Sequence, residues 1–294
     1  MRSTAYERDD VTAWDVARPA RPSRAAGVSM AGFGVRSLAA VGLRMVPHPA
    51  VMLAVEFGDG IPFVDDAAGR QHRGSVVAGL GVGFGGAIRV RGENVECVQV
   101  RLAPTVARAI LGVSPAELEN VVVTLEDLWG REASRIREQL GDASSWKDRF
   151  ALTDAVLARR HEAAPPVDPE VAWAWHRIAV SRGLVRIDHL ATEVGWSRKR
   201  LWSRFHSQIG LPPKRAAKLV RFDHAAHRLV AGEGVAQVAA DGGYADQSHL
   251  HRDVMTFTGV TPTTLAGEPW LAVDDTAWPN QPPRSDLRRQ LSTA

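Results

Sequence analysis

Apolar residues follow a two-residue spacing in the first third of the chain. Across residues 35–100, short apolar segments are separated by Gly, Pro and Asp, and residues 50–57 end at a Gly-Asp-Gly turn. In residues 95–102, Val and Leu alternate with polar Gln99 and Arg101, which predicts a strand with one buried and one solvent-exposed face. We therefore expect a first domain built mainly of strands.

From Pro104 onward the apolar spacing becomes helical. Ser114 followed by Pro115 is typical of a helix start, and Ser145 precedes another apolar stripe. Residues 133–140 carry apolar side chains at helical spacing, as expected of a helix with one buried face. Such a helical layer fits either the cover of the sheet or a dimer interface, and the pattern does not distinguish them.

A proline-rich connector at residues 162–169 precedes a part in which every element has helical spacing. Asp168 can cap the next helix, with Pro169 at its first position. With 294 residues, 45% of them hydrophobic, the chain is long enough for two domains that each bury a core. We expect a poorly ordered lead-in (1–28), a sensor or partner domain (29–161), a linker (162–169), an all-helical domain (170–266) and a flexible tail (267–294).

Residues 187–206 carry the pattern of a helix-turn-helix. Gly195 permits a tight turn after the first helix, Ser197 can cap the second, and Leu201 and Phe205 form its buried side. A cationic helix face also fits an ordinary solvated surface, so this stretch alone leaves both interpretations open. The predicted base-reading residues are Lys199, Arg200, Trp202 and Ser203, and the predicted phosphate contacts are Ser197, Arg198, Arg204 and His206.

A fainter copy of this unit follows, with Gly243 standing 48 residues after Gly195. Leu250 and Val254 face inward in the copy, and residues 213–231 form one apolar-faced helix that connects the two units as a rigid spacer. The outward side of the second helix of the copy carries Ser248, His249, His251 and Arg252, and Gln247 stands at its exposed N-terminal end.

Further residues complete an ordered tandem pattern: Leu190-Ala191, Gly195-Trp196-Ser197, Leu201, Phe205, Gly210-Leu211-Pro212-Pro213, Arg221, Gly243-Tyr244-Ala245-Asp246-Gln247-Ser248, Arg252 and Gly259-Val260-Thr261-Pro262. With these residues, positions 171–266 resemble the DNA-binding domain of the AraC/XylS family of transcription regulators. The resemblance implies that two recognition helices enter successive major grooves, with centres about 34 Å apart. It also implies base reading by Lys199, Trp202 and Ser203 of the first unit and by Gln247, Ser248, His251 and Arg252 of the second, where His249 is a predicted phosphate contact. It also implies a sensor or partner domain that is a small β-barrel followed by helices, so the predicted fold class is α+β.

Four positions depart from that family pattern. Gly242 stands where an apolar residue usually ends the first helix of the second unit, Ala245 replaces a capping serine, and Val254 replaces a bulky aromatic residue. Ser203 of the first unit stands where arginine is frequent. We therefore expect an underfilled core in the second unit, and specificity that rests mainly on the first unit.

The distribution of charge agrees with a polyanion-binding second half. The net charge is +3, but residues 171–267 hold 13 Lys+Arg against 7 Asp+Glu, whereas residues 1–170 hold 20 against 22. Cys97 is the single cysteine, which excludes an internal disulfide and fits a reducing cytoplasm. No apolar run approaches the roughly 20 residues of a membrane span. We expect a cytoplasmic protein without cofactor or membrane contact.

Other candidate chemistry is weaker. The glycine run at residues 79–86 contains a GxGxxG pattern, but a strand-like segment follows it, which favours a bulged strand or hairpin over a phosphate site. His48, Glu56 and His72 lack the spacing of metal ligands, so no metal site is expected. Cys97 is interpreted as a small core residue and not as a reactive thiol.

The sequence therefore predicts a transcription regulator, more specifically an activator, that binds double-stranded promoter DNA. Further candidate partners are RNA polymerase, a small-molecule effector and a second copy of the chain. The alternative hypothesis is a DNA-localised repair-type enzyme with a methyl-accepting cysteine. Cys97 has no companion thiol and no basic neighbour in sequence, so we expect no catalytic site.

Overall fold

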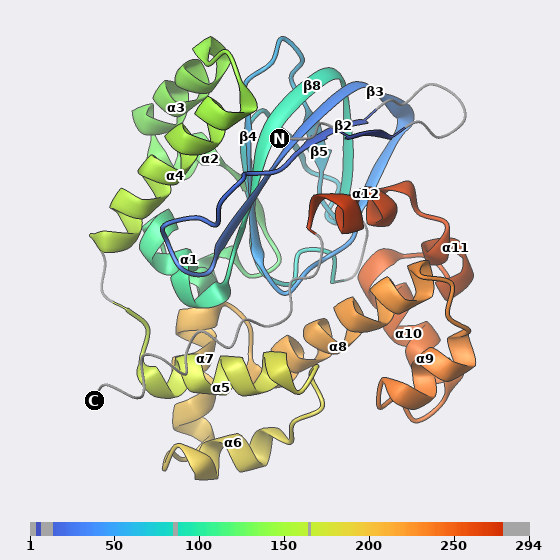
Figure 1. Cartoon of the computed structure of the whole chain (residues 1–294). Coiled ribbons are helices and arrows are strands. Elements are labelled where there is room, and N and C mark those ends of the chain that lie inside the picture. Colours follow the sequence, from blue (N-terminus) through green and yellow to red (C-terminus); the bar gives the residue numbers. More distant parts are fainter. Residues whose placement is uncertain (1–3, 7–13, 85–87, 164–165, 279–294) are drawn as a thin grey trace.

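The computed structural model describes residues 4–6, 14–84, 88–163 and 166–278. In this part of the chain, nine strands form one antiparallel sheet, and helices cover the sheet and build the second half of the molecule (Figure 1). The fold class is α+β, as predicted. The strands are β1 (Thr4–Tyr6), β2 (Trp14–Ala17), β3 (Val28–Met45), β4 (Val51–Glu56), β5 (Phe63–Asp65), β6 (Gln71–Arg73), β7 (Val76–Ala78), β8 (Ile88–Leu102) and β9 (Val122–Thr124).

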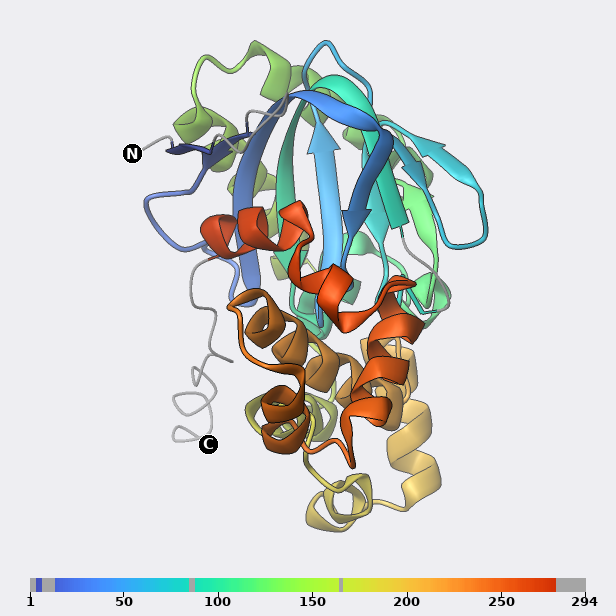
Figure 2. The same ribbon diagram turned by 90° about the vertical axis from the view of Figure 1, so that its right-hand side faces the viewer.

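The two longest strands, β3 and β8, form the centre of the sheet. They pair along most of their length, with a register shift between Leu38 and Leu43. On its other side β8 pairs with both β4 and β5, and the main strand order is β1-β2-β3-β8-β4-β7-β9. Strands this long twist and bend, and Figure 2 shows the curvature of the sheet.

The predicted lead-in belongs to this sheet at residues 4–6 and from Trp14 onward. β2 pairs with β3 through residues 14–17, and Trp14 is buried against Phe33 with the two rings edge to face. The expectation of poor order at residues 1–28 is therefore wrong for residues 4–6 and 14–28, because β1 and β2 form this edge of the sheet. Residues 1–3 and 7–13 lie outside the described part of the chain.

Helices cover one face of the sheet. α3 and α4 lie beside it in Figure 1, and Ser145 caps α4 by accepting a hydrogen bond from the Asp148 amide, as the sequence predicts. Ser114 begins a single turn of 3-10 helix (Pro115–Leu118), which is shorter than expected because β9 follows it. The helices of this part are α1 (Pro104–Leu111), α2 (Leu125–Trp129), α3 (Arg131–Asp142) and α4 (Trp146–Glu162).

The second half is helical throughout. Its helices are α5 (Pro169–Val180), α6 (Ile187–Glu193), α7 (Arg198–Ile209), α8 (Pro213–Val230), α9 (Val235–Asp241), α10 (Gln247–Thr258), α11 (Pro262–Ala266) and α12 (Pro269–Ala277). The apolar stripe predicted for α8 is buried as expected, with Leu219 and Phe222 fully covered. Among the described helices, none combines the length and the apolar composition that crossing a bilayer requires.

Helix α12 returns from the helical half to the sheet. Val273, Ala277 and Trp278 pack against Trp14 and Phe33, and Figure 2 shows α12 lying across the front of the sheet. Residues 269–277 are therefore not part of a flexible tail, as the sequence suggested, because their apolar face has a sheet to cover. Residues 279–294 of the expected tail lie outside the described residues.

This helix also changes the interpretation of β8. The sequence predicted that Gln99 and Arg101 face solvent, but both side chains are buried. Arg101 forms an ion pair with Asp274 of α12, and its guanidinium lies 4.5 Å from the centre of the Trp278 ring. A polar residue on a strand faces solvent only where no other element packs on that face of the sheet. Here α12 packs on that face.

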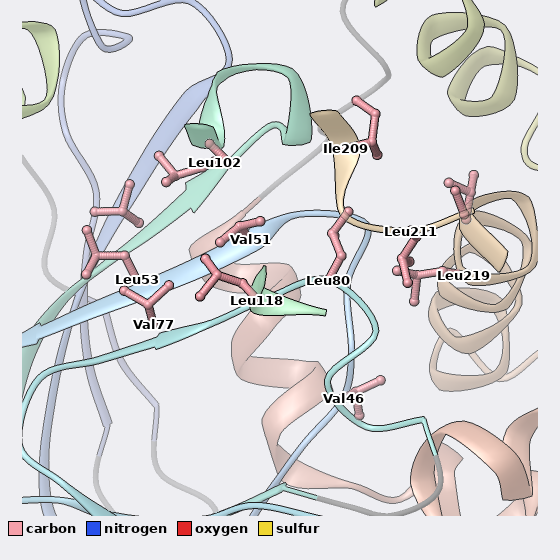
Figure 3. Packing of buried hydrophobic residues seen from close by; sticks show 14 of the residues in the cluster. Val46, Val51, Leu53, Val77, Leu80, Leu102, Leu118, Ile209, Leu211 and Leu219 are labelled. Carbon is pink, nitrogen blue, oxygen red and sulfur yellow. The ribbon is translucent and has the colours of Figure 1, made fainter. Parts of the chain in front are cut away.

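The buried apolar residues of the two halves join in one continuous cluster. Figure 3 shows Leu80, from the loop after β7, between the sheet residues and Leu211 and Leu219 of the helical half. The same loop contains Gly81, where an added Cβ would lie 3.1 Å from the Leu211 side chain. The predicted separate cores therefore meet at this junction, and the glycine run serves close packing between the halves. No helix follows it, because β8 begins at Ile88.

Candidate DNA interface

The first helix-turn-helix has the geometry that its sequence predicts. Gly195 adopts a left-handed backbone with φ +66° between α6 and α7, a conformation that favours glycine. Ser197 is the N-cap of α7, and its hydroxyl accepts a hydrogen bond from the Arg200 amide at 3.2 Å. Leu201 and Phe205 are fully buried, which fixes the rotation of α7 about its axis. The opposite side of α7 therefore faces solvent.

The four predicted base-reading residues of α7 all lie on this exposed side. Lys199, Arg200, Trp202 and Ser203 are exposed, and 51% of the Trp202 surface is open to solvent. About half of this large indole ring has no contact within the chain, so that part is available for a partner. The Arg200 guanidinium lies 4.4 Å from the centre of the Trp196 ring, which supports its long side chain at the start of the helix.

The predicted phosphate contacts of α7 differ in their surroundings. Arg198 is largely exposed and lies 3.2 Å from Asp188 of α6. Arg204 makes two hydrogen bonds, of 2.7 and 2.8 Å, to the Asp168 carboxylate at the start of α5. These bonds lower the pKa of Asp168 below its ordinary value and raise that of Arg204. Asp168 was predicted to cap α5, but its side chain makes no capping hydrogen bond.

His206 lies on the side of α7 that faces the N-terminal half. Its Nε2 atom lies 2.7 Å from the Glu119 carboxylate, and its ring lies 5.2 Å from that of Trp202. Arg215 of α8 contacts the same carboxylate. Glu119 therefore joins the first recognition helix and the linker helix to the N-terminal half, a role that the sequence analysis missed because contacts so distant in sequence leave no local pattern.

The second unit repeats the first with one extra residue in its turn. Asp246 is the N-cap of α10, where its carboxylate accepts a hydrogen bond from the His249 amide at 2.7 Å. The expectation that Ala245 leaves this helix without a cap is wrong, because the cap is shifted by one residue. From the cap onward the two units correspond at a spacing of 49 residues, with Leu250 in the place of Leu201.

The exposed side of α10 carries the predicted residues of this unit. Gln247, Ser248, His251 and Arg252 are exposed, and the Arg252 side chain bonds back to the Ser248 carbonyl at 3.3 Å. His249 is half-buried and packs edge to face on Tyr244, with the ring centres 5.2 Å apart. His249 is therefore less accessible than the other four.

The interior of the second unit holds more aromatic bulk than expected. Val254 is small, but Phe257 is fully buried one turn later and stacks on Phe222 of α8, with the ring centres 4.3 Å apart. An added Cβ at Gly242 would lie 3.1 Å from the Tyr244 ring, so the glycine lets this ring pack closely. The prediction of an underfilled core overlooked Phe257.

An acidic residue on the inner side of α10 orients this helix. Asp253 is buried and forms ion pairs with Lys218 at 3.0 Å and Arg221 at 3.3 Å, both on α8. The Arg221 guanidinium also lies 4.6 Å from the centre of the Tyr244 ring. The sequence could have indicated this contact, because Asp253 stands three residues after Leu250 and so on the buried side.

The histidines considered for a metal centre do not meet Glu56. His72 contacts Asp66 at 3.3 Å, and Glu56 pairs with Arg137. His48 lies in the irregular segment before β4, where its Nδ1 atom lies 2.8 Å from Asp223 of the linker helix. The residues grouped by the sequence analysis therefore belong to three separate contacts.

One family model and several solved structures are similar to this chain. A family model described as a helix-turn-helix domain matches residues 190–267. A search of curated proteins gave no match. Among solved structures, ToxT from Vibrio cholerae O395 is similar at 11% identity, with 82% of this chain and 98% of that chain covered and a TM-score of 0.45. ToxT from V. cholerae strain SCE256, bound to unsaturated fatty acid, gives 10% identity, 84% and 97% coverage and a TM-score of 0.43. The C-terminal domain of AraT, a response regulator from Geobacillus stearothermophilus, gives 19% identity, 34% and 86% coverage and a TM-score of 0.32.

Proposed function

We propose that this chain, which carries an AraC-type helix-turn-helix domain, is a transcription regulator that reads two successive major grooves of promoter DNA. The observation that carries this proposal is the repetition of one unit at a spacing of 49 residues. In both copies an apolar pair is buried and four polar or aromatic side chains lie exposed on the opposite side. Two equivalent exposed surfaces fit duplex DNA, because its major groove recurs at every helical turn.

The chemistry of the exposed side chains supports base reading by both helices. Lys199 and Arg200 of α7 and Arg252 of α10 can donate to guanine, and Gln247 can bond adenine at two atoms. Trp202 offers an apolar surface to a thymine methyl group. The remaining predicted base-reading residues, Ser203, Ser248 and His251, are exposed beside these side chains.

The flanking residues divide into two groups in this proposal. Arg198 is exposed and can reach a phosphate. Arg204 and His206 would first have to leave Asp168 and Glu119, so we propose that they position α7 in the free protein. Ser197 acts as the helix cap, with its hydroxyl engaged by the Arg200 amide, so we propose that it positions α7 as well.

Selection from a random duplex library with the full chain tests this function. The selected site should bind far more tightly than a scrambled duplex. Lys199→Ala and Arg200→Ala should each weaken that binding by about 1–3 kcal/mol if they contact bases, measured by fluorescence anisotropy at fixed salt. Lys147→Ala is the matched control, because Lys147 is an exposed cation on α4. Equal binding to every duplex, without enrichment of any sequence, would refute the proposal.

A cavity in the sheet domain supports a further role as a sensor of a small molecule. It has a volume of about 130 Å³ and is lined mainly by apolar side chains of the curved strands. A cavity of about 150 Å³ accommodates a benzene ring, so the effector is of that size. In the described part of the chain, the lining atoms Gln99 Oε1 and Glu56 Oε2 are buried and accept no hydrogen bond. We propose a small apolar effector with one hydrogen-bond donor.

A melting-temperature screen tests the sensor role. Small aromatic alcohols should raise the melting temperature more than the corresponding hydrocarbons, because a ligand that prefers the folded state stabilises it. Gln99→Leu should abolish this preference for the alcohol. No stabilisation by any member of either series would contradict the sensor role and leave DNA binding unaffected. RNA polymerase and a second copy of the chain remain predicted partners.

The repair-enzyme alternative loses support at Cys97. Burial and the neighbouring carboxylates of Glu56 and Glu96 raise the pKa of the Cys97 thiol to about 12. A methyl acceptor must be a thiolate to act as a nucleophile. The surroundings of Cys97 therefore oppose this activity.

A further inference from the structure

Three distant segments of the chain bring two histidines and two carboxylates together at the junction of the halves. His48 precedes β4, Asp223 and His227 lie one turn apart on the linker helix α8, and Asp274 lies on α12. One ligating atom from each of His48, His227 and Asp274 lies within 4.8 Å of the other two. His48 and Asp274 are only 6% and 0% exposed, so this cluster is enclosed within the molecule.

The Asp223 carboxylate fixes the orientation of the His48 ring. Its Oδ1 atom lies 2.8 Å from His48 Nδ1, which directs His48 Nε2 toward Asp274 Oδ2 at 3.5 Å. These last two atoms are buried, and neither has a hydrogen-bond partner in the described part of the chain. The other oxygen of Asp274 pairs with Arg101. Two buried polar atoms thus face one another at a separation of 3.5 Å.

This arrangement is that of a histidine prepared to bind a metal. A histidine that ligates a metal through one ring nitrogen usually donates the other to a carboxylate, which sets the tautomer and raises the basicity of the ligating nitrogen. Asp223 occupies that position for His48. At metal–ligand distances of about 2.0–2.1 Å, neighbouring ligands of a tetrahedral zinc site lie about 3.3 Å apart. The pair His48 Nε2 and Asp274 Oδ2 already has nearly this separation.

We propose that His48, His227 and Asp274 bind one divalent transition-metal ion, with zinc as the best fit, and that Asp223 positions His48. Two imidazole nitrogens and one carboxylate oxygen form a donor set that zinc accepts, and three protein ligands leave one coordination position open. The side chain of His227 is 31% exposed, which gives the ion a path from solvent, and its Nε2 atom lies 3.7 Å from Asp223 Oδ1. Metal binding would therefore replace this contact of His227 with a bond to the ion.

The ion would join the sheet domain, the linker helix and α12, because each contributes one ligand. It would therefore stabilise the junction between the halves. This inference is independent of the proposed function, since it rests on the cluster alone.

Metal titration of the full chain tests the inference. The chain is first treated with a chelator and dialysed, and zinc is then titrated in competition with a chromophoric chelator. One equivalent should bind, and the melting temperature should rise with zinc concentration. His227→Ala and His227→Gln should each lose at least tenfold in zinc affinity, and Asp223→Asn about 10–100-fold. His224→Ala is the matched control, because His224 lies on the same helix outside the cluster and should bind zinc as the parent does.

Three results would overturn the inference. One is uptake of less than one equivalent by the parent chain, which needs no variant to interpret. Another is equal zinc affinity in the His224 and His227 variants, both shown to be folded by circular dichroism, because the bound zinc would then sit elsewhere. If His48 is instead a protonated bridge between Asp223 and Asp274, zinc will not change the melting temperature, and this outcome also overturns the inference.

Discussion

The thiol of Cys97 should be almost inert in the folded chain. Its pKa of about 12 compares with an ordinary value of 9.0, and the largest cause is burial, followed by the charges of Glu56 and Glu96. A difference of about three pKa units lowers the thiolate fraction about a thousandfold at any pH well below both values. Since only the thiolate reacts with alkylating reagents, the alkylation rate should fall by a similar factor.

The assay is simple because Cys97 is the single cysteine. Alkylation by iodoacetamide is followed by mass spectrometry at about pH 8, in buffer and in urea, and the urea rate gives the reactivity of the unfolded chain. Steric protection alone would slow the reaction equally at all pH values. The pKa argument instead predicts that the folded rate keeps rising about tenfold per pH unit beyond pH 9, and that Glu96→Gln raises the rate. A folded rate within tenfold of the urea rate would refute the reasoning.

Three further predictions concern the helical half, each measured by urea unfolding. Gly183→Ala should cost about 2 kcal/mol more than Gly195→Ala, because both backbones are left-handed but only at Gly183 would the new Cβ meet a backbone oxygen, at 2.1 Å; equal costs would contradict this. Asp246→Ala should cost about 1 kcal/mol through loss of the α10 cap, and an unchanged midpoint would show that the cap contributes nothing. Asp168→Asn should destabilise the chain near neutral pH, but less so as pH falls below 3.8. The lowered pKa of Asp168 means that its pairing with Arg204 stabilises the fold above that range and is lost as the carboxylate is protonated, so a pH-independent difference would exclude this pairing as the cause.

Local patterns predicted most elements of the fold. The Ser145 and Ser197 caps and the buried pair Leu201 and Phe205 all depend on neighbours within one or two helical turns, and the structure places them as expected. The cap of α10 was misassigned by one residue because the second turn is longer. The N-cap is the residue just before the first turn of the helix. Its distance from the turn glycine can be transferred from the first unit to the second only if both turns have the same length.

Contacts between distant segments could not be predicted in this way. Gln99 and Arg101 have the pattern of an exposed strand face, yet both are buried. Arg101 pairs with Asp274 of α12, and Gln99 lines the internal cavity. Of the candidate interface, the sequence predicted which residues of α7 and α10 are exposed. It did not predict that Arg204 and His206 have carboxylate partners, because Asp168 and Glu119 lie 36 and 87 residues away.

The position of α12 has a consequence for the synthesis of the chain on the ribosome. The sheet is made first, but the apolar surface around Trp14 and Phe33 is covered by residues 273–278, which are translated only after the helix-turn-helix units. Domains usually fold as they emerge, the N-terminal one first. The apolar face of the nascent sheet therefore stays exposed to solvent until α12 has left the exit tunnel. A chain cut short before α12 would retain its helix-turn-helix units and expose a surface that favours aggregation.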